Sequence, residues 1–130
     1  MSEAPTEKLE LVAYEDANQM EPATLACELR EHLGARLVAF IAGVKETRAV
    51  HEWAKNGRKM NQGAEQRLRL AYRVYRLVSS RDNDRVAQAW FQGLNPKLDD
   101  RSPARLLRDG DLEEVGPYVL AAARAFAAIG

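Results

Sequence analysis

Residues 64–78 form the segment that most limits what this chain can fold into. Projected on a helix at about 100° per residue, its apolar side chains cover more than half of the circumference, and Arg69, Arg73 and Arg76 form a narrow stripe on the remainder. A helix with so much apolar surface has to be covered from more than one side. We therefore predict an all-α protein in which this helix is central and the arginine stripe is its solvated edge.

The segment before this helix also follows a helical pattern. After Pro22, Leu25, Leu29 and Leu33 recur every four residues, and a second apolar helix is predicted to end at Gly43. No segment shows a convincing strand-like alternation of apolar and polar residues. The chain is therefore predicted to consist of helices joined by short turns.

The chain divides at two changes in composition. Residues 1–22 are polar and acidic, and we expect them to form a flexible arm that is loosely held. A polar run rich in helix-capping residues follows residue 78 and predicts a boundary between domains of residues 23–80 and 81–130. A chain of 130 residues can bury about two thirds of its unfolded surface, which suffices for a fold without disulfides or metals.

The formal net charge of +0 hides a strong asymmetry along the chain. Residues 1–32 carry two basic side chains and eight carboxylates, residues 33–81 carry eleven and three, and residues 82–130 carry six and eight. A basic middle segment is expected of a surface that binds phosphates. The same arginines would also suit a solvated helix face or ion pairs with the acidic ends, so charge alone leaves both interpretations open.

Residues 34–57 carry the pattern of a helix-turn-helix. A short helix over residues 35–42, a turn at residues 43–45 and a second helix over residues 47–55 are predicted, with Val50 and Trp53 facing inward. The side chains expected to meet bases or phosphates are Thr47, Arg48, His51, Glu52, Lys55, Arg58 and Lys59. Arg48 is the strongest candidate, because a guanidinium matches the two major-groove acceptors of guanine. The alternative is an ordinary helical hairpin with an exposed basic side.

Several classes of function find no support in the sequence. Cys27 is the single cysteine, which argues against a disulfide framework or a cysteine metal site and fits a reducing cytoplasm. No stretch is apolar enough to span a membrane, and the acidic start does not fit a signal peptide. No metal-spaced, nucleophilic or phosphate-loop motif stands out. We therefore expect a cytoplasmic protein that is not an enzyme and uses no cofactor or metal.

Residues 90–110 predict a helix end, an ordered loop and a new short helix. Gly93 is expected to close the first helix in the left-handed conformation. Ser102 followed by Pro103 has the pattern of an N-cap with proline at the first helical position. Gly110 is expected to close the short helix.

The last segment predicts a further helix with an unusual surface. Asp111, with Glu114 three residues on, has the pattern of an N-cap and capping box, and Gly116–Pro117 should kink the helix or restart it. From Val119 to the end of the chain only Arg124 is charged. Such a helix has to bury more than one face, and either a partner protein or the chain's own first domain would cover the second face.

This C-terminal pattern resembles the toxin-binding domain of the Xre/MbcA/ParS-type antitoxins. The matching residues are Trp90, Asn95, Pro96, Leu98, Arg101, Ser102, Pro103, Leu106, Leu107, Gly110 and Val115. In that family an Xre-like DNA-binding domain comes first, so the resemblance spans residues 33–130. The helix-turn-helix part departs from the family pattern, because its turn holds one residue more and Ala49 fills a position that is usually bulkier. The register of the recognition helix therefore stays open.

The resemblance implies the antitoxin of a type II toxin–antitoxin pair, which binds operator DNA and represses its own operon. Its partner would be a toxin of the RES class, which consumes NAD, and the C-terminal end of the antitoxin would block the entrance to the toxin's active site. The residues expected to bind the toxin are Asn95, Pro96, Arg101, Arg124, Phe126, Ile129 and Gly130. A homodimer or a hetero-oligomer with the toxin is expected, without a membrane partner.

Two alternatives to the antitoxin stay open. The first is a stand-alone transcriptional repressor whose C-terminal unit only dimerises. The second is a protein-interaction module that has no role in DNA binding.

Overall fold

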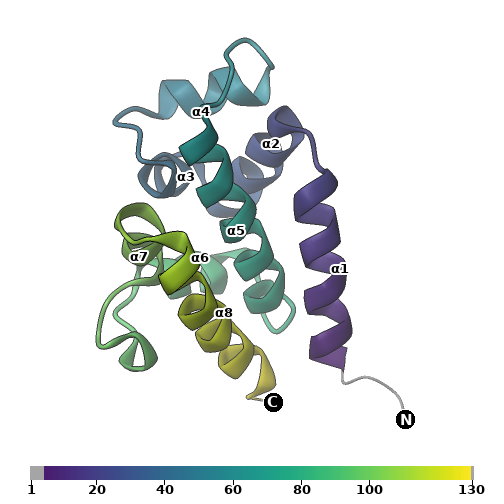
Figure 1. Cartoon of the computed structure of the whole chain (residues 1–130), viewed down its shortest axis with the longest axis vertical. Helices are drawn as coiled ribbons and strands as arrows, with labels where there is room; N and C mark the ends of the chain where they lie inside the picture. The colour runs from purple at the N-terminus through teal and green to yellow at the C-terminus, as the bar shows by residue number, and fades with distance from the viewer. Residues whose placement is uncertain (1–4, 130) are drawn as a thin grey trace.

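A computed structural model describes residues 5–129 of the chain, and these fold as an all-α protein, as predicted (Figure 1). They form eight α-helices and one short 3-10 helix, η1, with no strand among them: α1 (Pro5–Gln19), α2 (Pro22–Leu33), α3 (Ala35–Ala42), α4 (Thr47–Ala54), α5 (Gln62–Ser79), α6 (Asp84–Gln92), η1 (Pro96–Leu98), α7 (Pro103–Asp109) and α8 (Leu112–Ala128). Within this range no helix combines the length and the hydropathy that crossing a membrane requires.

Helix α5 is the centre of the fold, as the apolar pattern of residues 64–78 predicts. It begins at a cap, because the side-chain oxygen of Asn61 accepts a hydrogen bond from the backbone N–H of Ala64 at 2.8 Å. In Figure 1, α5 runs through the middle of the molecule with α1 on one side and α8 on the other, and it packs against both. Its buried residues are Ala64, Leu68, Leu70, Ala71, Tyr72, Val74, Tyr75, Leu77 and Val78.

One hydrophobic core joins helices from both predicted domains. The fully buried side chains of this core include Leu29 and Val50 from the first half and Phe91, Leu107 and Val119 from the second. The predicted boundary after residue 80 falls in the turn between α5 and α6, but α5 packs against helices on both sides of it. The two halves therefore share α5 and a single core.

The N-terminal segment differs from the loosely held arm that composition predicts. Residues 5–19 form helix α1, which packs along α5 and buries Ala13 and Ala17. Arg73 of α5 lies beneath it, with its guanidinium carbon 4.7 Å from the centre of the Tyr14 ring. The expectation of an arm is wrong for these residues because small alanines, rather than large apolar side chains, face the core and give a weak amphipathic signal. Residues 1–4 of the predicted arm lie outside the described residues.

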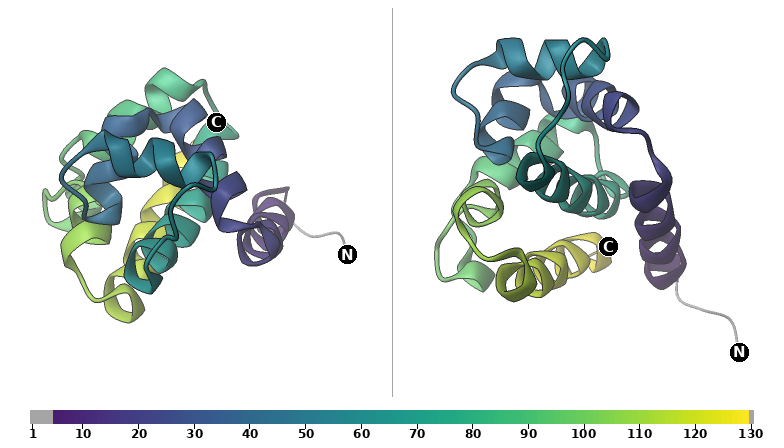
Figure 2. Two further views of the ribbon diagram at one scale, coloured as in Figure 1. Left: turned by 90° about the horizontal axis from the view of Figure 1, so that it is seen from above. Right: turned by 45° about the horizontal axis from the view of Figure 1, so that its top comes forward.

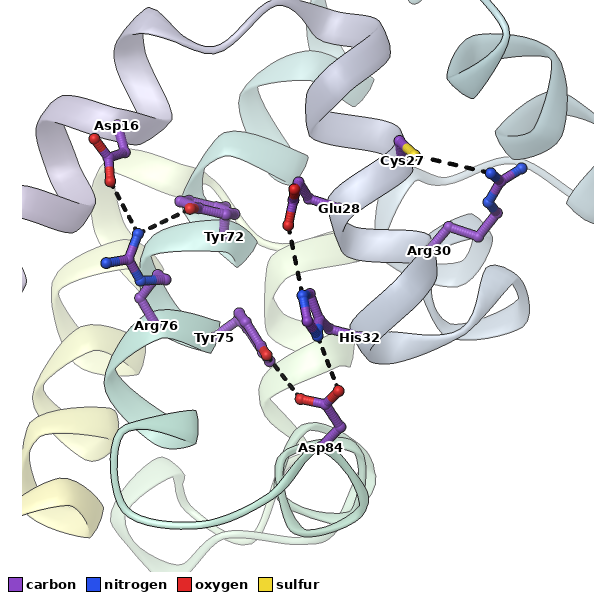
Figure 3. A network of polar contacts seen from close by, with 9 residues as sticks. All are labelled: Asp16, Cys27, Glu28, Arg30, His32, Tyr72, Tyr75, Arg76 and Asp84. Atoms are coloured by element: carbon purple, nitrogen blue, oxygen red, sulfur yellow. Dashed lines mark hydrogen bonds and ion pairs between the residues drawn. The ribbon is translucent and has the colours of Figure 1, made fainter.

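The arginine stripe of α5 is covered by α1, so it is not the solvated edge that the pattern predicts. Arg69 donates hydrogen bonds to the carbonyl oxygen of Ala17 and, at 2.8 Å, to that of Met20. Nη1 of Arg76 lies 2.9 Å from Oδ2 of Asp16 (Figure 3). The acidic N-terminal segment and the basic middle segment thus meet each other, which is the ion pairing that the charge pattern left open.

The helix caps of the second half lie where the sequence predicts, with one exception. The side chains of Ser102 and Asp111 start α7 and α8, since they accept hydrogen bonds from the N–H groups of Arg105 at 3.2 Å and Glu113 at 2.9 Å. Gly93 ends α6 in an extended conformation at φ −81°, so the left-handed cap predicted there is wrong. The chain leaves α6 extended because it next forms an isolated bridge between residues 95 and 101.

Helix α8 continues through Pro117 without the restart that was one of the two expectations. Val119 and Leu120 are among the residues that it buries, and it packs on α5 and α7. By contrast, Tyr118 and Ile129 are 68% and 62% exposed. The chain's own core therefore covers one face of α8 and leaves Tyr118 open on another, as well as Ile129 just after the helix.

Replacing Arg69 with alanine tests whether the covered stripe holds α1 in place. The substitution removes charge-assisted hydrogen bonds to two backbone carbonyls, and we expect the free energy of unfolding in urea to fall by about 2 kcal/mol. Amide hydrogen exchange should speed up more in α1 than in α8. The matched control is Arg85→Ala at an exposed position of α6, and equal protection of α1 in the two variants would contradict the prediction.

Candidate nucleic-acid interface

Helices α2, α3 and α4 pack together as a three-helix unit at one end of the molecule (Figure 2). Residues 43–46 join α3 to α4, and α2 packs against both helices. Gly43 takes the left-handed conformation at φ 85°, which residues other than glycine rarely adopt. Its N–H bonds to Phe40 O at 3.1 Å, and the following N–H bonds to Ala39 O at 3.0 Å, so the end of α3 is closed as a Schellman turn. These boundaries agree with the predicted helix-turn-helix, except that the second helix ends one residue earlier.

Helix α4 is held in a defined orientation by its inner face and its end. Val50 and Trp53, which were predicted to face inward, are both buried in the core. The end of α4 is a second left-handed turn at Asn56, φ 62°, where the next N–H bonds to Glu52 O at 2.8 Å. The outer side chains of α4 are therefore presented by a fixed helix.

The structure brings the seven residues predicted to meet DNA together on the outer side of α4 and in the turn after it. Five of them are exposed: Arg48, His51, Lys55, Arg58 and Lys59. Thr47 and Glu52 are half-buried at the edges of this face. The Arg48 side chain is 81% exposed, which leaves its guanidinium open to a ligand.

One carboxylate of this cationic face lies near two of its arginines. Oε1 of Glu52 is 3.7 Å from Nε of Arg48 and 3.6 Å from Nη1 of Arg58. Exposed ion pairs at such distances are weak, so they do not hold the two arginines away from an incoming phosphate or base.

Arg30 of α2 also belongs to this face, although no sequence pattern places it there. Its Nη1 donates to Nδ1 of His51 on α4 at 3.1 Å. The helical pattern of α2 marks residue 30 only as polar, and its neighbour on α4 depends on how the two helices cross. Local sequence therefore carries no signal for this contact.

The residues predicted to bind a toxin differ from one another in their burial and in their hydrogen bonds. Asn95 is half-buried, and its side-chain oxygen accepts a hydrogen bond from the N–H of Lys97 at 2.9 Å. Its own N–H donates to Arg101 O at 3.1 Å. The side chains of Pro96 and Arg101 are exposed. Asn95 therefore stabilises the loop, whereas the side chains of Pro96 and Arg101 are accessible to a partner.

The remaining predicted toxin-binding residues lie on α8 or after it. Nη1 of Arg124 is 2.6 Å from Oε1 of Glu10 on α1, and the Phe126 ring centre is 6.3 Å from that of Trp90. Both side chains thus make contacts within the chain. Ile129 is exposed, and Gly130 lies outside the described residues.

A polar network outside both predicted sites joins α2, α5 and α6 (Figure 3). Nδ1 of His32 is 2.9 Å from Oδ2 of Asp84, and the Tyr75 hydroxyl donates to Oδ1 of the same carboxylate at 2.7 Å. The rings of His32 and Tyr75 stack with centres 5.0 Å apart, and Glu28 lies 3.5 Å from the other ring nitrogen of His32. No local sequence pattern indicates this network, because His32 and Asp84 are 52 positions apart.

The network shifts the titration of its members. Burial opposes protonation of His32, but the hydrogen bond to Asp84 and the charges of Asp84, Glu28 and Glu31 outweigh it and raise the pKa of His32 above 6.5. The hydrogen bonds from His32 and Tyr75 lower the pKa of Asp84 below 3.8. Burial, together with the hydrogen bond to Asp84, raises the pKa of Tyr75 to about 12.

Glu28, Glu31 and His32 are the group, within the described part of the chain, that could hold a metal ion. One ligand atom from each lies within 4.8 Å of the others. Both ring nitrogens of His32 already face carboxylates, Asp84 on one side and Glu28 on the other. This pairing accounts for the arrangement without a metal.

Comparison with known protein families, with curated proteins and with solved structures finds no match. The support for a function therefore comes from the sequence patterns of the chain and from the geometry of its side chains.

The His32 network predicts how stability depends on pH. Because the pKa of His32 is raised in the folded chain, its protonation stabilises the fold; this contribution is fully present below the unfolded-state pKa of about 6.5 and is lost as the pH rises through the folded-state pKa. Asp84, whose pKa is lowered, stabilises the fold above its unfolded-state pKa, and this contribution is lost as the pH falls through the lowered value. We expect the melting temperature to fall between about pH 6 and pH 8.

The substitution His32→Gln should make the melting temperature less dependent on pH over this range. The matched control is His51→Gln, which replaces the chain's other histidine and should retain the slope. An unchanged slope in His32→Gln would show that another group is responsible.

Proposed function

We propose that this protein binds duplex DNA by placing α4 in the major groove, as a helix-turn-helix protein does. The observation that carries the proposal is the outward face of α4, where Arg48 and His51 are exposed on a helix that Val50 and Trp53 fix from below. Lys55 and Arg58 are exposed directly after this helix. The major groove is about 12 Å wide and admits one helix with its side chains. On this proposal Arg48 reads a base edge.

The charges around α4 also support DNA as the ligand. Lys55, Arg58 and Lys59 follow one another at the end of the helix and its turn, and all three are exposed. Cations that flank a reading helix contact phosphates and position the protein without reading sequence. On this proposal the three side chains bind the backbone beside the groove that α4 enters.

We further infer that the protein is an antitoxin that neutralises a partner toxin by direct binding and represses its own operon. The resemblance of residues 90–115 to the Xre/MbcA/ParS-type antitoxins supports this, and it favours a RES-class, NAD-consuming toxin. Leu94, Tyr118 and Ile129 are large apolar side chains that stay exposed in the same half of the chain. A protein partner would cover such side chains.

A stand-alone repressor is the second candidate. It is favoured by the contacts of Arg124 with Glu10 and of Phe126 with Trp90, since both side chains then serve the fold and need no toxin. The C-terminal half would in that case provide only a dimer contact.

The DNA proposal predicts sequence-specific binding that depends on salt. By fluorescence anisotropy, a labelled duplex from the region upstream of the protein's own reading frame should bind more tightly than a scrambled duplex, and affinity should fall steeply between about 50 and 200 mM salt. Arg48→Ala should cost about 1–3 kcal/mol on the upstream duplex and reduce the preference over the scrambled one. The control Arg85→Ala should change neither the affinity for the upstream duplex nor the preference over the scrambled one.

Two outcomes count against the DNA proposal. Absence of salt-dependent binding would defeat it as a whole. An intact sequence preference in Arg48→Ala would mean that another residue occupies the base-reading position.

The antitoxin proposal predicts that the product of an adjacent reading frame arrests growth and that this protein restores it. Removing residues 125–130 would also remove the packing of Phe126 on Trp90, so substitutions at exposed positions test the complex with less disturbance of the fold. The double substitution Leu94→Asp and Ile129→Asp changes exposed positions and should weaken the complex of the two purified proteins by about tenfold or more. Leu11→Asp, at an exposed position of α1, is the matched control. If the purified proteins do not associate, the stand-alone repressor is the better account.

A further inference from the structure

A cationic hollow lies between α7 and the turn that joins α3 to α4. Helix α7 packs against α3, and the hollow between them has a volume of about 500 Å³. Two of its cations, Arg36 and Lys45, come from the helix-turn-helix, and two, Arg105 and Arg108, come from α7. The two α7 arginines belong to the C-terminal segment, which carries more acidic than basic side chains. In the fold, however, they lie beside Arg36 and Lys45 of the basic middle segment.

The positive charge of this hollow is only partly compensated. Among the described residues that line it, Asp109 is the one that is acidic. Its carboxylate oxygens lie 3.6 Å from Nε of Arg105 and 3.6 Å from Nε of Arg108. These distances exceed that of a charge-assisted hydrogen bond. Four cations thus share one carboxylate, and the hollow attracts anions.

Arg108 is positioned before any ligand arrives. Its Nη1 donates to the carbonyl oxygen of Phe40 at 3.0 Å, and its guanidinium carbon lies 4.7 Å from the centre of the Phe40 ring. A guanidinium held by a carbonyl and an aromatic ring loses less conformational entropy on binding an anion. The Arg105 side chain, by contrast, is 71% exposed and can move to meet a phosphate.

The hollow is continuous with the face of α4 that the proposed function assigns to DNA. Thr47, the first residue of α4, lines it. Lys45 lines both this hollow and a neighbouring one that also contains Arg48 and Arg58, together with the carboxylates of Glu46 and Glu52. A strip of cations therefore extends from α4 across the turn to α7.

We propose that α7 is a second part of the DNA interface, in which Arg105 and Arg108, with Arg36 and Lys45, bind backbone phosphates beside the groove that α4 enters. The inference rests on the proposed DNA-binding function and extends it to residues of the C-terminal half. An extended polyanion fits a strip of separated cations, because duplex DNA presents a negative charge about every 1.7 Å along its axis. Contacts of this kind strengthen binding to every sequence and do not discriminate among bases.

The test compares binding of the full chain to the upstream duplex and to the scrambled duplex at several salt concentrations. Loss of one phosphate contact should reduce the slope of log affinity against log salt by about 0.9. Arg105→Gln should therefore weaken binding about five- to tenfold at 0.1 M salt on both duplexes. Arg105→Lys should restore the slope, because a lysine ammonium also neutralises a phosphate. Arg85→Gln removes the same charge from α6 and should leave affinity and slope unchanged.

The double variant Arg105→Gln, Arg108→Gln should reduce the slope by about 1.8. Since Arg108 also contacts Phe40, the melting temperature of this variant is measured alongside. If the double variant unfolds, the single variant Arg105→Gln alone tests the role of α7, because the Arg105 side chain is largely exposed and its replacement should not disturb the fold.

The outcomes separate the inference from the proposed function. If the wild-type protein binds neither duplex at low salt, the proposed function fails and this inference fails with it. If the wild type binds and Arg105→Gln behaves like Arg85→Gln, only the role of α7 is overturned. If Arg105→Gln leaves DNA binding intact but weakens the complex with the product of the adjacent reading frame, the hollow is a protein-binding surface and the inference is wrong.

Discussion

Burial of α5 is the constraint on which the rest of the structure depends. Nine of its residues are buried, and fully burying a large apolar side chain is worth about 1.5–3 kcal/mol relative to leaving it exposed. No single helix can cover so wide an apolar surface. Helices from both halves of the chain, including α1, α3 and α8, pack on it from different sides. The place of each of these helices is therefore set by the side of α5 that it covers.

The same packing brings charged groups together and steadies the candidate interface. The arginines of α5 meet the C-terminal part of α1, and His32, Tyr75 and Asp84 tie α2 to α5 and α6. Because α2 also packs against α4, the outer face of α4 is connected to the core through a helix that is itself anchored at its C-terminal end. A reading helix needs such support, since base contacts depend on accurate placement of a few side chains.

The arrangement suits a protein with two partners. In Figure 1, α4 lies at one end of the molecule and the end of α8 lies toward the other. On the proposals made above, DNA would occupy the first end and a toxin the second, so both could be bound at once. With the role proposed for α7, the C-terminal half would contact both the DNA and the toxin through different residues. Arg105 and Arg108 would serve the DNA, and the exposed residues Leu94 and Ile129 would serve the toxin.

The sequence by itself determined the features that depend on neighbours a few positions away. These are the all-α class, the boundaries of α3, the start of α4, the burial of Val50 and Trp53, and the cap at Ser102, because helix periodicity and capping are local properties. Only the tertiary structure decided that Arg76 meets Asp16 and that Arg105 lies beside the α3–α4 turn. A helical pattern states which face of a helix is polar, but not which distant segment covers that face. Ion pairs and binding surfaces made from two helices therefore become visible only once the apolar faces have packed.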